Sequence, residues 1–304
     1  MSAPEEIGEQ LLTSCDSGDF DSVRSSVDSG ASVDFQDEEG DTPAIQCCFR
    51  GHAEILKYII EKGADADRTD NYGHTPLFVA AQENQRGCVS LLLAHGVDAD
   101  RATNDGATPL YVAAYFNQQE CVSLLLAHGV DADSATNTGC TPLFIAAQKN
   151  SKECVSLLLA HGVDENKANN NGVTPIMTAA YSNHQEIVSL LLQHDGIAVD
   201  AVDNRGQTAL WFASYQGHRS VAELLVQSGA NIDVADNDGK TAIVIAREKG
   251  YAELAAYLDA ESKRRRRGPF AKVRTSIKDV EDSDEPVMRV LQNDDLAREI
   301  RAYL

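Results

Sequence analysis

The sequence predicts an all-α solenoid in which pairs of antiparallel helices are joined by β-turn tips. Its first basis is a Thr followed by Pro or Ala that recurs at spacings of 33, 33, 33, 33, 34 and 33 residues. These threonines are Thr42, Thr75, Thr108, Thr141, Thr174, Thr208 and Thr241. Its second basis is the almost fixed stretch CVSLLLAHGVD, which begins at Cys88, Cys121 and Cys154. A constant period of this length is typical of proteins whose units stack to bury one continuous core.

Each unit opens with a turn and a short first helix. A Gly stands two residues before each Thr, as Gly106 does before Thr108, and Gly adopts positive φ at little cost. The Thr is a good N-cap, and Pro is favoured at the first helical position. The first helix then runs through Leu-[Phe/Tyr]-[Val/Ile]-Ala-Ala, as in residues 110–114.

A second breaker separates this helix from the next one. It is Gly51, Asn84, Asn117, Asn150, Asn183, Gly217 or Gly250. Asn follows Gly in its tolerance of the left-handed conformation that ends a helix. The second helix, such as the one from Cys121, carries Val and Leu at helical spacing and ends at another Gly.

These features resemble the ankyrin repeat family in the Thr-Pro-Leu start, the Ala-Ala pair, the Gly51-His52 step and the Gly63-Ala64 step. The resemblance implies an ankyrin-repeat solenoid with seven clear repeats and a degenerate capping repeat over residues 1–36, where Gly18 and Gly30 align with the two breakers. The repeat domain covers 37–260, with units near 37–69, 70–102, 103–135, 136–168, 169–202, 203–235 and 236–260.

The chain departs from the family at one position. The family has His three residues after the Thr, whereas this chain has Phe78, Tyr111, Phe144, Met177 and Trp211. We therefore expect the polar tie that this His makes between neighbouring turns to be absent, with ring packing in its place.

Composition and charge exclude several classes of protein. The net charge of the chain is −21, and it arises in residues 1–260, which hold 38 acidic and 15 basic side chains (−23), whereas residues 261–304 hold 11 basic and 9 acidic ones (+2). An acidic body repels nucleic acid and anionic lipid, so neither is expected as a partner. The acidic start and the seven cysteines at irregular local spacing favour an intracellular protein, in the cytoplasm and also the nucleus if the basic run described below directs import.

Three recurring sets of side chains resemble reactive sites, but each has a structural explanation. Cys88, Cys121 and Cys154 are expected in the core, because one repeat step of about 8–10 Å is too long for shared zinc ligation. His95, His128 and His161 suit the last turn of the second helix. The Asp-Ala-Asp turns lack the Gly and Glu of a calcium loop. We expect no catalytic residues, metal or cofactor.

The two positions after Ala-Ala hold aromatic residues in some repeats and polar or charged residues in others, whereas the neighbouring positions are nearly the same in every repeat. The family binds partners through the turn tips and the concave face of the first helix, so the resemblance implies that these positions are exposed there. Rings are favoured interface anchors, although they can also simply cover the helix. The pairs are Phe49-Arg50, Gln82-Glu83, Tyr115-Phe116, Gln148-Lys149, Tyr181-Ser182, Tyr215-Gln216 and Glu248-Lys249.

Variable residues at the turn tips extend this candidate surface. They are Tyr72, His74, Asp105, Arg205 and Lys240. The hypothesis is an acidic, ring-lined groove that holds a basic or amphipathic segment of a partner protein.

The repeat pattern stops at residue 261. Residues 261–285 are expected to form a linker, first basic and then acidic and disordered. Its basic run is a candidate nuclear import signal or a solvated charge run, and consists of Lys263, Arg264, Arg265, Arg266 and Arg267. Residues 286–304 predict an amphipathic helix that resembles the start of an F-box, although Gln292 replaces the family's Pro.

Taken together, these features predict a monomeric, non-catalytic scaffold for protein–protein interactions. The alternative is a substrate-recognition adaptor of a ubiquitin ligase, docked through residues 286–304.

Overall fold

A computed structural model describes the backbone of residues 3–281 and the side chains of residues 5–266. Within residues 3–281 the secondary structure is sixteen α-helices and one isolated β-bridge between Ala235 and Thr241. The helices are α1 (Ala3–Ser17), α2 (Phe20–Asp28), α3 (Pro43–Arg50), α4 (Ala53–Glu61), α5 (Pro76–Gln82), α6 (Arg86–His95), α7 (Pro109–Tyr115), α8 (Gln119–His128), α9 (Pro142–Gln148), α10 (Lys152–His161), α11 (Pro175–Tyr181), α12 (Gln185–Leu192), α13 (Ala209–Gln216), α14 (Arg219–Gln227), α15 (Ala242–Glu248) and α16 (Ala252–Glu281).

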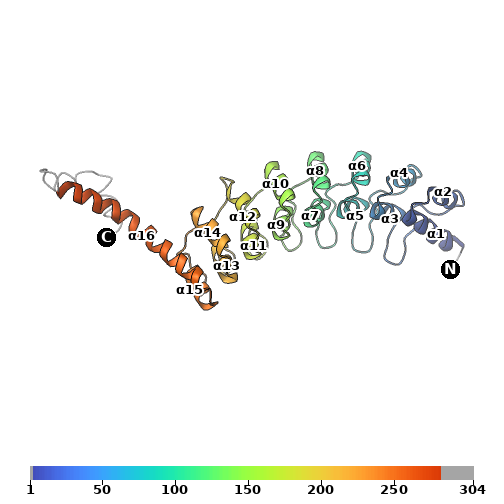
Figure 1. Cartoon of the computed structure of the whole chain (residues 1–304). Helices are drawn as coiled ribbons and strands as arrows, with labels where there is room; N and C mark the ends of the chain where they lie inside the picture. Colours follow the sequence, from blue (N-terminus) through green and yellow to red (C-terminus); the bar gives the residue numbers. More distant parts are fainter. Residues whose placement is uncertain (1–2, 282–304) are drawn as a thin grey trace.

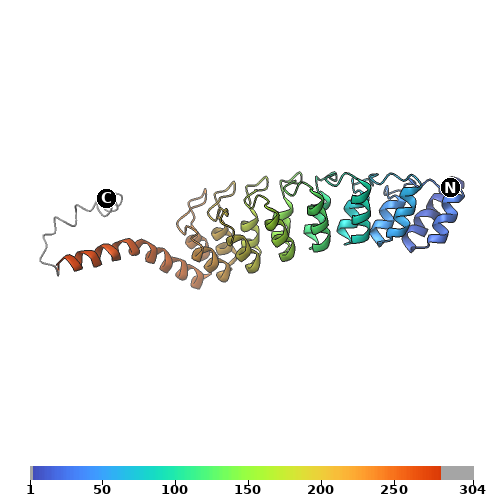
Figure 2. The ribbon, with the colours of Figure 1, turned by 90° about the horizontal axis from the view of Figure 1, so that it is seen from above.

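The helices pair into eight repeats, from repeat 1 (α1 and α2) to repeat 8 (α15 and the start of α16), and the repeats stack in chain order. Figure 1 shows the odd-numbered helices in one row and the even-numbered helices in the other, with the hairpin loops extending from the odd row. The stack is bowed in this view, with the odd row on the inner side. Odd helices pack more extensively against each other than even helices do, which is consistent with that curvature. Seen from above, the repeats follow one another along a single line (Figure 2).

The local rules that predict the helices operate as expected. The Oγ1 atoms of Thr42, Thr75, Thr108, Thr141, Thr208 and Thr241 accept the N–H at the third helical position, for example from Tyr111 to Thr108 at 3.2 Å. Thr174 is the exception, because its Oγ1 has no partner while its N–H donates to Met177 Sδ at 3.4 Å. The four breaker asparagines adopt positive φ, between 56° and 61°.

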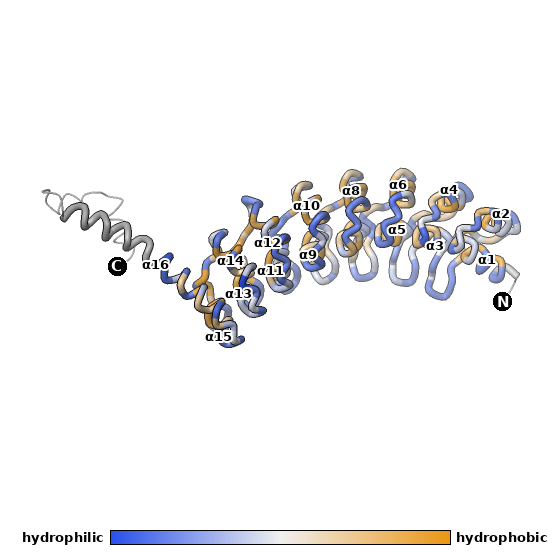
Figure 3. The backbone as a smooth tube through the Cα atoms, viewed as in Figure 1, coloured by the Kyte–Doolittle hydropathy of each residue, from blue (hydrophilic) through white to orange (hydrophobic). Residues whose placement is uncertain are grey.

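The core runs along the stack between the two helix rows. Leu77, Leu110 and Leu143 are fully buried or nearly so, and the Ala pairs let consecutive odd helices approach closely. Figure 3 shows the apolar residues repeating from helix to helix, with polar residues in the loops. Each buried Leu contributes about 1.5–3 kcal/mol relative to exposure, so a core distributed over all the repeats makes each one dependent on its neighbours.

Polar ties join neighbouring turns even though this chain lacks the family's His. Asparagine supplies them, four residues before every Thr of the series except Thr42. The side-chain amide of Asn137 donates to the carbonyl of Asn104 at 2.9 Å, and Asn104 donates in turn to Asn71 at 3.1 Å. The same bond is made by Asn170, Asn204 and Asn237 to the preceding turn. The aromatic residues at the family's His position do not disrupt the turns, because another side chain joins them.

The Asp-Ala-Asp turns form a second ladder. Asp100 Oδ1 accepts the backbone N–H of Asp131 in the next repeat at 3.0 Å, and Asp133 accepts that of Asp164. Within one turn, Asp131 Oδ1 accepts the N–H of Asp133 at 3.0 Å. These aspartates hold the loops in register.

The linker expected from residue 261 is helical as far as Glu281, because α16 continues through it. Lys and Arg are strong helix formers, and Ser262 stands where the preceding repeat has Gly229, so the basic run extends the second helix of repeat 8. Beyond that run the helix also contains Gly268 and Pro269, and propensity does not explain this part. The predicted helix over 286–304, with its F-box resemblance, lies outside the described residues.

Candidate protein-binding surface

The two residues after each Ala-Ala pair lie at the C-terminal ends of the odd helices, in one row along the stack. We call this row the ring stripe. Side chains from the following repeat fix its backbone. His184 Nε2 lies 3.0 Å from the Gln148 carbonyl, and His218 Nε2 lies 3.0 Å from that of Tyr181. Gln118 Nε2 donates to the Gln82 carbonyl at 2.9 Å.

Two tyrosines of the ring stripe are covered by lysines of the next repeat. Lys149 Nζ lies 4.3 Å from the centre of the Tyr115 ring, and Lys249 Nζ lies 4.2 Å from that of Tyr215. Both tyrosines are only half-exposed. A cation over a ring face contributes about 0.5–1 kcal/mol at exposed sites. These pairs couple the first stripe position of one repeat to the second position of the next.

The most exposed rings of the stripe are Phe116, Tyr181 and Phe49, with exposed fractions of 49%, 44% and 41%. Phe116 packs beside Tyr115 at 4.7 Å between ring centres, and Tyr181 meets Phe212 edge-on at 6.0 Å. The Arg50 guanidinium lies over Phe49. The stripe therefore forms local clusters, since Phe49, Tyr115 and Tyr181 do not touch one another.

The remaining predicted stripe residues are polar. Gln82 donates to Glu83 at 2.8 Å, and both are half-buried, whereas Gln148 is exposed. Ser182 and Gln216 are half-buried as well.

The predicted tip residues lie on the same surface as the odd helices. Tyr72 is 61% exposed and stands beside His74, whose ring stacks on Phe78 of α5 at 4.7 Å. His74 also bonds Asp70 at 2.7 Å. Asp105 and Arg205 are exposed, and Lys240 reaches Glu248 in the ring stripe at 2.6 Å. We call the continuous surface of tips and ring stripe the helix-one face.

An aromatic cluster around Trp211 is a feature that sequence reasoning missed. The Trp211 ring stacks on Tyr215 at 5.2 Å and meets Phe212 at 5.6 Å, while its buried Nε1 has no partner. The signal in the sequence was the run LWFASY, the one unit with a second ring beside the usual one.

The acidic charge is not concentrated on the ring stripe, where Arg50, Glu83, Lys149 and Lys249 are of mixed sign. It repeats instead along the Asp-Ala-Asp turns, for example at the exposed Asp65, Asp98 and Asp131. The acidic residues that recur in every repeat thus belong to the turn ladder, and the acidic, ring-lined groove stays a hypothesis.

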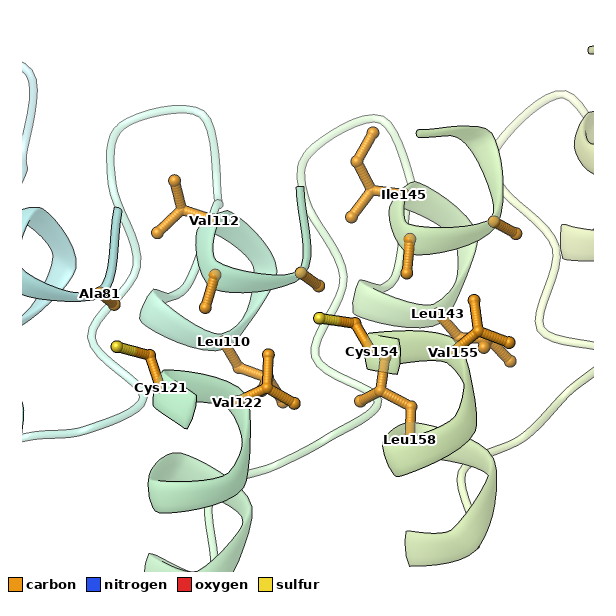
Figure 4. Packing of buried hydrophobic residues seen from close by; sticks show 14 of the residues in the cluster. Ala81, Leu110, Val112, Cys121, Val122, Leu143, Ile145, Cys154, Val155 and Leu158 are labelled. Atoms are coloured by element: carbon orange, nitrogen blue, oxygen red, sulfur yellow. The ribbon is translucent and has the colours of Figure 1, made fainter. Parts of the chain in front are cut away.

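The recurring cysteines are core residues, as expected. Cys88, Cys121 and Cys154 are fully buried, and Cys121 and Cys154 point into the core in Figure 4. Burial raises the pKa of Cys121 to about 11 and that of Cys154 to about 12, so both thiols stay protonated near neutral pH. His95, His128 and His161 are exposed at the ends of their helices. Among the described residues, no group of His, Cys, Asp or Glu is arranged to hold a metal ion.

The basic run is partly engaged with the stack. Arg265 donates to the carbonyls of Val226 and Ala230 at the end of α14, the latter at 2.7 Å. Arg266 pairs with Asp233 at 2.9 Å, whereas Lys263 and Arg264 bond acidic residues of α16 itself. The side chain of Arg267 lies outside the described residues.

Comparison with known proteins agrees with this architecture. A family model described as ankyrin repeats in three copies matches residues 11–103, 96–169, 162–236 and 196–266. No curated protein matches the chain. Over the described part of the chain, no helix is both long and apolar enough to cross a bilayer.

Proposed function

Because this chain belongs to the ankyrin repeat family, we propose that it is a non-catalytic scaffold that binds a segment of a partner protein on its helix-one face. Ankyrin repeats imply protein partners, and the site itself must be argued from this chain. The observation that supports it is the contrast between fixed and free positions. Residues such as Thr108 and Ala114 are buried and satisfied, whereas Phe116 and Tyr181 expose nearly half of their rings.

The partner segment that suits this face is amphipathic. Exposed rings bury large apolar area on binding with little loss of conformational freedom. The ring stripe carries both signs of charge, for example Glu83 and Lys149, which can add polar contacts at its edge. A purely basic segment fits less well, since the carboxylates of the Asp-Ala-Asp turns already bond the next repeat.

The test starts from a partner recovered by proximity labelling in the native cell and then purified. We expect Phe116→Ala with Tyr181→Ala, in the full chain, to weaken its binding by at least about tenfold, as for two interface anchors. The matched control is Ser123→Ala with Ser156→Ala, because both serines are exposed on the even helices α8 and α10 and bond only within them. We call the Phe116→Ala, Tyr181→Ala double variant the ring variant. If the ring variant and the serine control bind the partner with equal affinity, and both unfold at the same temperature as the natural chain, the proposal is falsified.

A further inference from the structure

The helix-one face carries opposite charge at its two ends. Toward the N-terminus, in repeats 2 to 4, its acidic side chains are Glu38, Glu39, Asp41, Glu83 and Asp105. Toward the C-terminus, in repeats 5 to 8, its basic side chains are Lys149, Arg205, Lys240 and Lys249, and they outnumber the exposed acidic ones, Asp238 and Glu248. The tip of repeat 5, with Thr138 and Cys140, separates the two ends and is uncharged.

Contacts within the chain preserve this polarity. Arg50 is the one basic stripe residue at the acidic end, and it already pairs with Asp16 at 2.7 Å. Glu38 and Glu39 are exposed. Burial and then the carboxylates of Asp37, Asp70 and Glu39 raise the pKa of Asp41 to about 6, so this end is short of compensating cations.

At the other end, the cations face rings or solvent. Arg205 is exposed at its tip, and no ion pair involves it among the described side chains. Lys149 and Lys249 lie over Tyr115 and Tyr215. Lys240 is offset by carboxylates, since it pairs with Glu248 at 2.6 Å and also lies near Asp238 and Asp236. Phe116 and Tyr181 stand between the two ends.

We propose that the helix-one face binds a bipolar segment, with the basic end of the segment over repeats 2 to 4, its acidic end over repeats 5 to 8 and apolar side chains on Phe116 and Tyr181. This inference rests on the proposed function and adds the orientation of the partner. Complementary charges fix the register of a complex, and like charges brought together in the wrong orientation oppose binding.

The experiment uses the full chain and synthetic peptides of one length with the same central Leu and Trp residues. Two peptides are bipolar, one with Lys before Glu and one with Glu before Lys, so that either chain direction is sampled. One peptide has only Lys and one has only Glu at the charged positions. We expect the better bipolar peptide to bind at least about tenfold more tightly than either single-sign peptide at low salt.

A photoreactive group at the lysine end of the bound peptide then locates it. We expect crosslinks to repeats 2 to 4 in the natural chain. In a charge-exchanged variant, with Glu38→Lys, Glu39→Lys, Arg205→Glu and Lys249→Glu, we expect them to move to repeats 7 and 8. Crosslinks that stay in place would overturn the inference, as would equal or tighter binding of a single-sign peptide, or no binding of any peptide.

The ring variant separates failure of this inference from failure of the proposed function. If the lysine peptide binds best and Phe116→Ala with Tyr181→Ala abolishes its binding, the face is a binding site and the polarity is wrong. If that variant leaves all peptide binding unchanged, the proposed function fails as well.

Discussion

At the residue scale, the glycine before each threonine meets two requirements at once. Gly106 has φ of 80°, and a Cβ there would lie 2.8 Å from the backbone nitrogen of Asn137 in the next repeat. The first requirement is a backbone with positive φ. The second is the absence of a Cβ, because the backbone of Asn137 must come close to make the hydrogen-bond ladder of asparagines.

A pair of substitutions separates the two requirements. Gly129 also has positive φ, 91°, but nothing lies within 4 Å of a Cβ placed there. We expect Gly129→Ala to lower the free energy of unfolding by about 1–2 kcal/mol through backbone strain alone. Gly106→Ala should cost clearly more, because it also displaces Asn137. Urea unfolding of both variants checks this, and equal losses would show that the turn absorbs the clash.

Asp41 is a residue whose charge works against folding. Burial and its acidic neighbours raise the pKa of Asp41 to about 6 from its usual value of 3.8. The folded chain therefore binds this proton more tightly than the unfolded chain does, and stability falls as pH rises from about 4 to about 6.

We expect Asp41→Asn to be more stable than the natural chain above pH 6, by about 1 kcal/mol after allowance for solvent screening of a half-exposed group. The difference should vanish below about pH 3, where Asp41 is protonated in both states. Asn retains an oxygen that can accept the Gln46 side chain, which Asp41 now does at 3.0 Å. Thermal unfolding at several pH values measures this, and a pH-independent difference would contradict it.

At the scale of the elements, α16 replaces a missing ninth repeat. In internal repeats the aspartate of one loop accepts an N–H from the next repeat, as Asp200 does from Asn231. Asp233 has no further repeat to bond, and instead accepts Ser262 Oγ at 3.1 Å and pairs with Arg266. Arg265 covers the carbonyls at the end of α14, where a cation also suits the helix dipole.

We expect Arg265→Ala to destabilise repeat 8 by about 1–2 kcal/mol, because hydrogen bonds from a charged donor to two carbonyls are lost. Arg264→Ala is the matched control, since the Arg264 guanidinium pairs with Glu261 on its own helix. Amide hydrogen exchange should show faster opening of α16 and α14 in the Arg265 variant only. Similar exchange in both variants would mean that this contact does not hold the last repeat.

At the scale of the whole molecule, the period of the sequence was enough to predict the solenoid, its helix caps and its core cysteines. The asparagine and aspartate ladders recur at the same period, at Asn104 and Asn137 for example, but the acceptor of each amide belongs to another repeat and appears only when the repeats are stacked. The ring stripe was predicted as a set of exposed positions. The lysines over Tyr115 and Tyr215 could not be predicted, because they depend on the rotation between repeats. The continuation of α16 to Glu281 could not be predicted, because Gly268 and Pro269 within it normally end a helix.

The placement of the acidic charge affects the stability of the whole stack. Asp65, Asp98 and Asp131 are exposed and recur once per repeat, about 8–10 Å apart by helix packing distance. That spacing is close to the Debye length at about 0.1 M salt, so neighbouring carboxylates repel one another at low ionic strength. A body with a net charge of −21 adds a more general repulsion in the compact state.

We therefore expect the full chain to gain about 1–2 kcal/mol of stability between about 0.05 M and about 0.5 M NaCl, as screening removes this repulsion. Urea unfolding is the suitable measurement, because urea adds no ions. Exchange of all three aspartates for Asn keeps an acceptor oxygen for the bond that Asp131 makes to the N–H of Asp133 and removes only the charge. This variant should gain less from salt than the natural chain. An equal gain would place the repulsion elsewhere in the acidic body, and no gain in either chain would show that the stack tolerates its charge without cost.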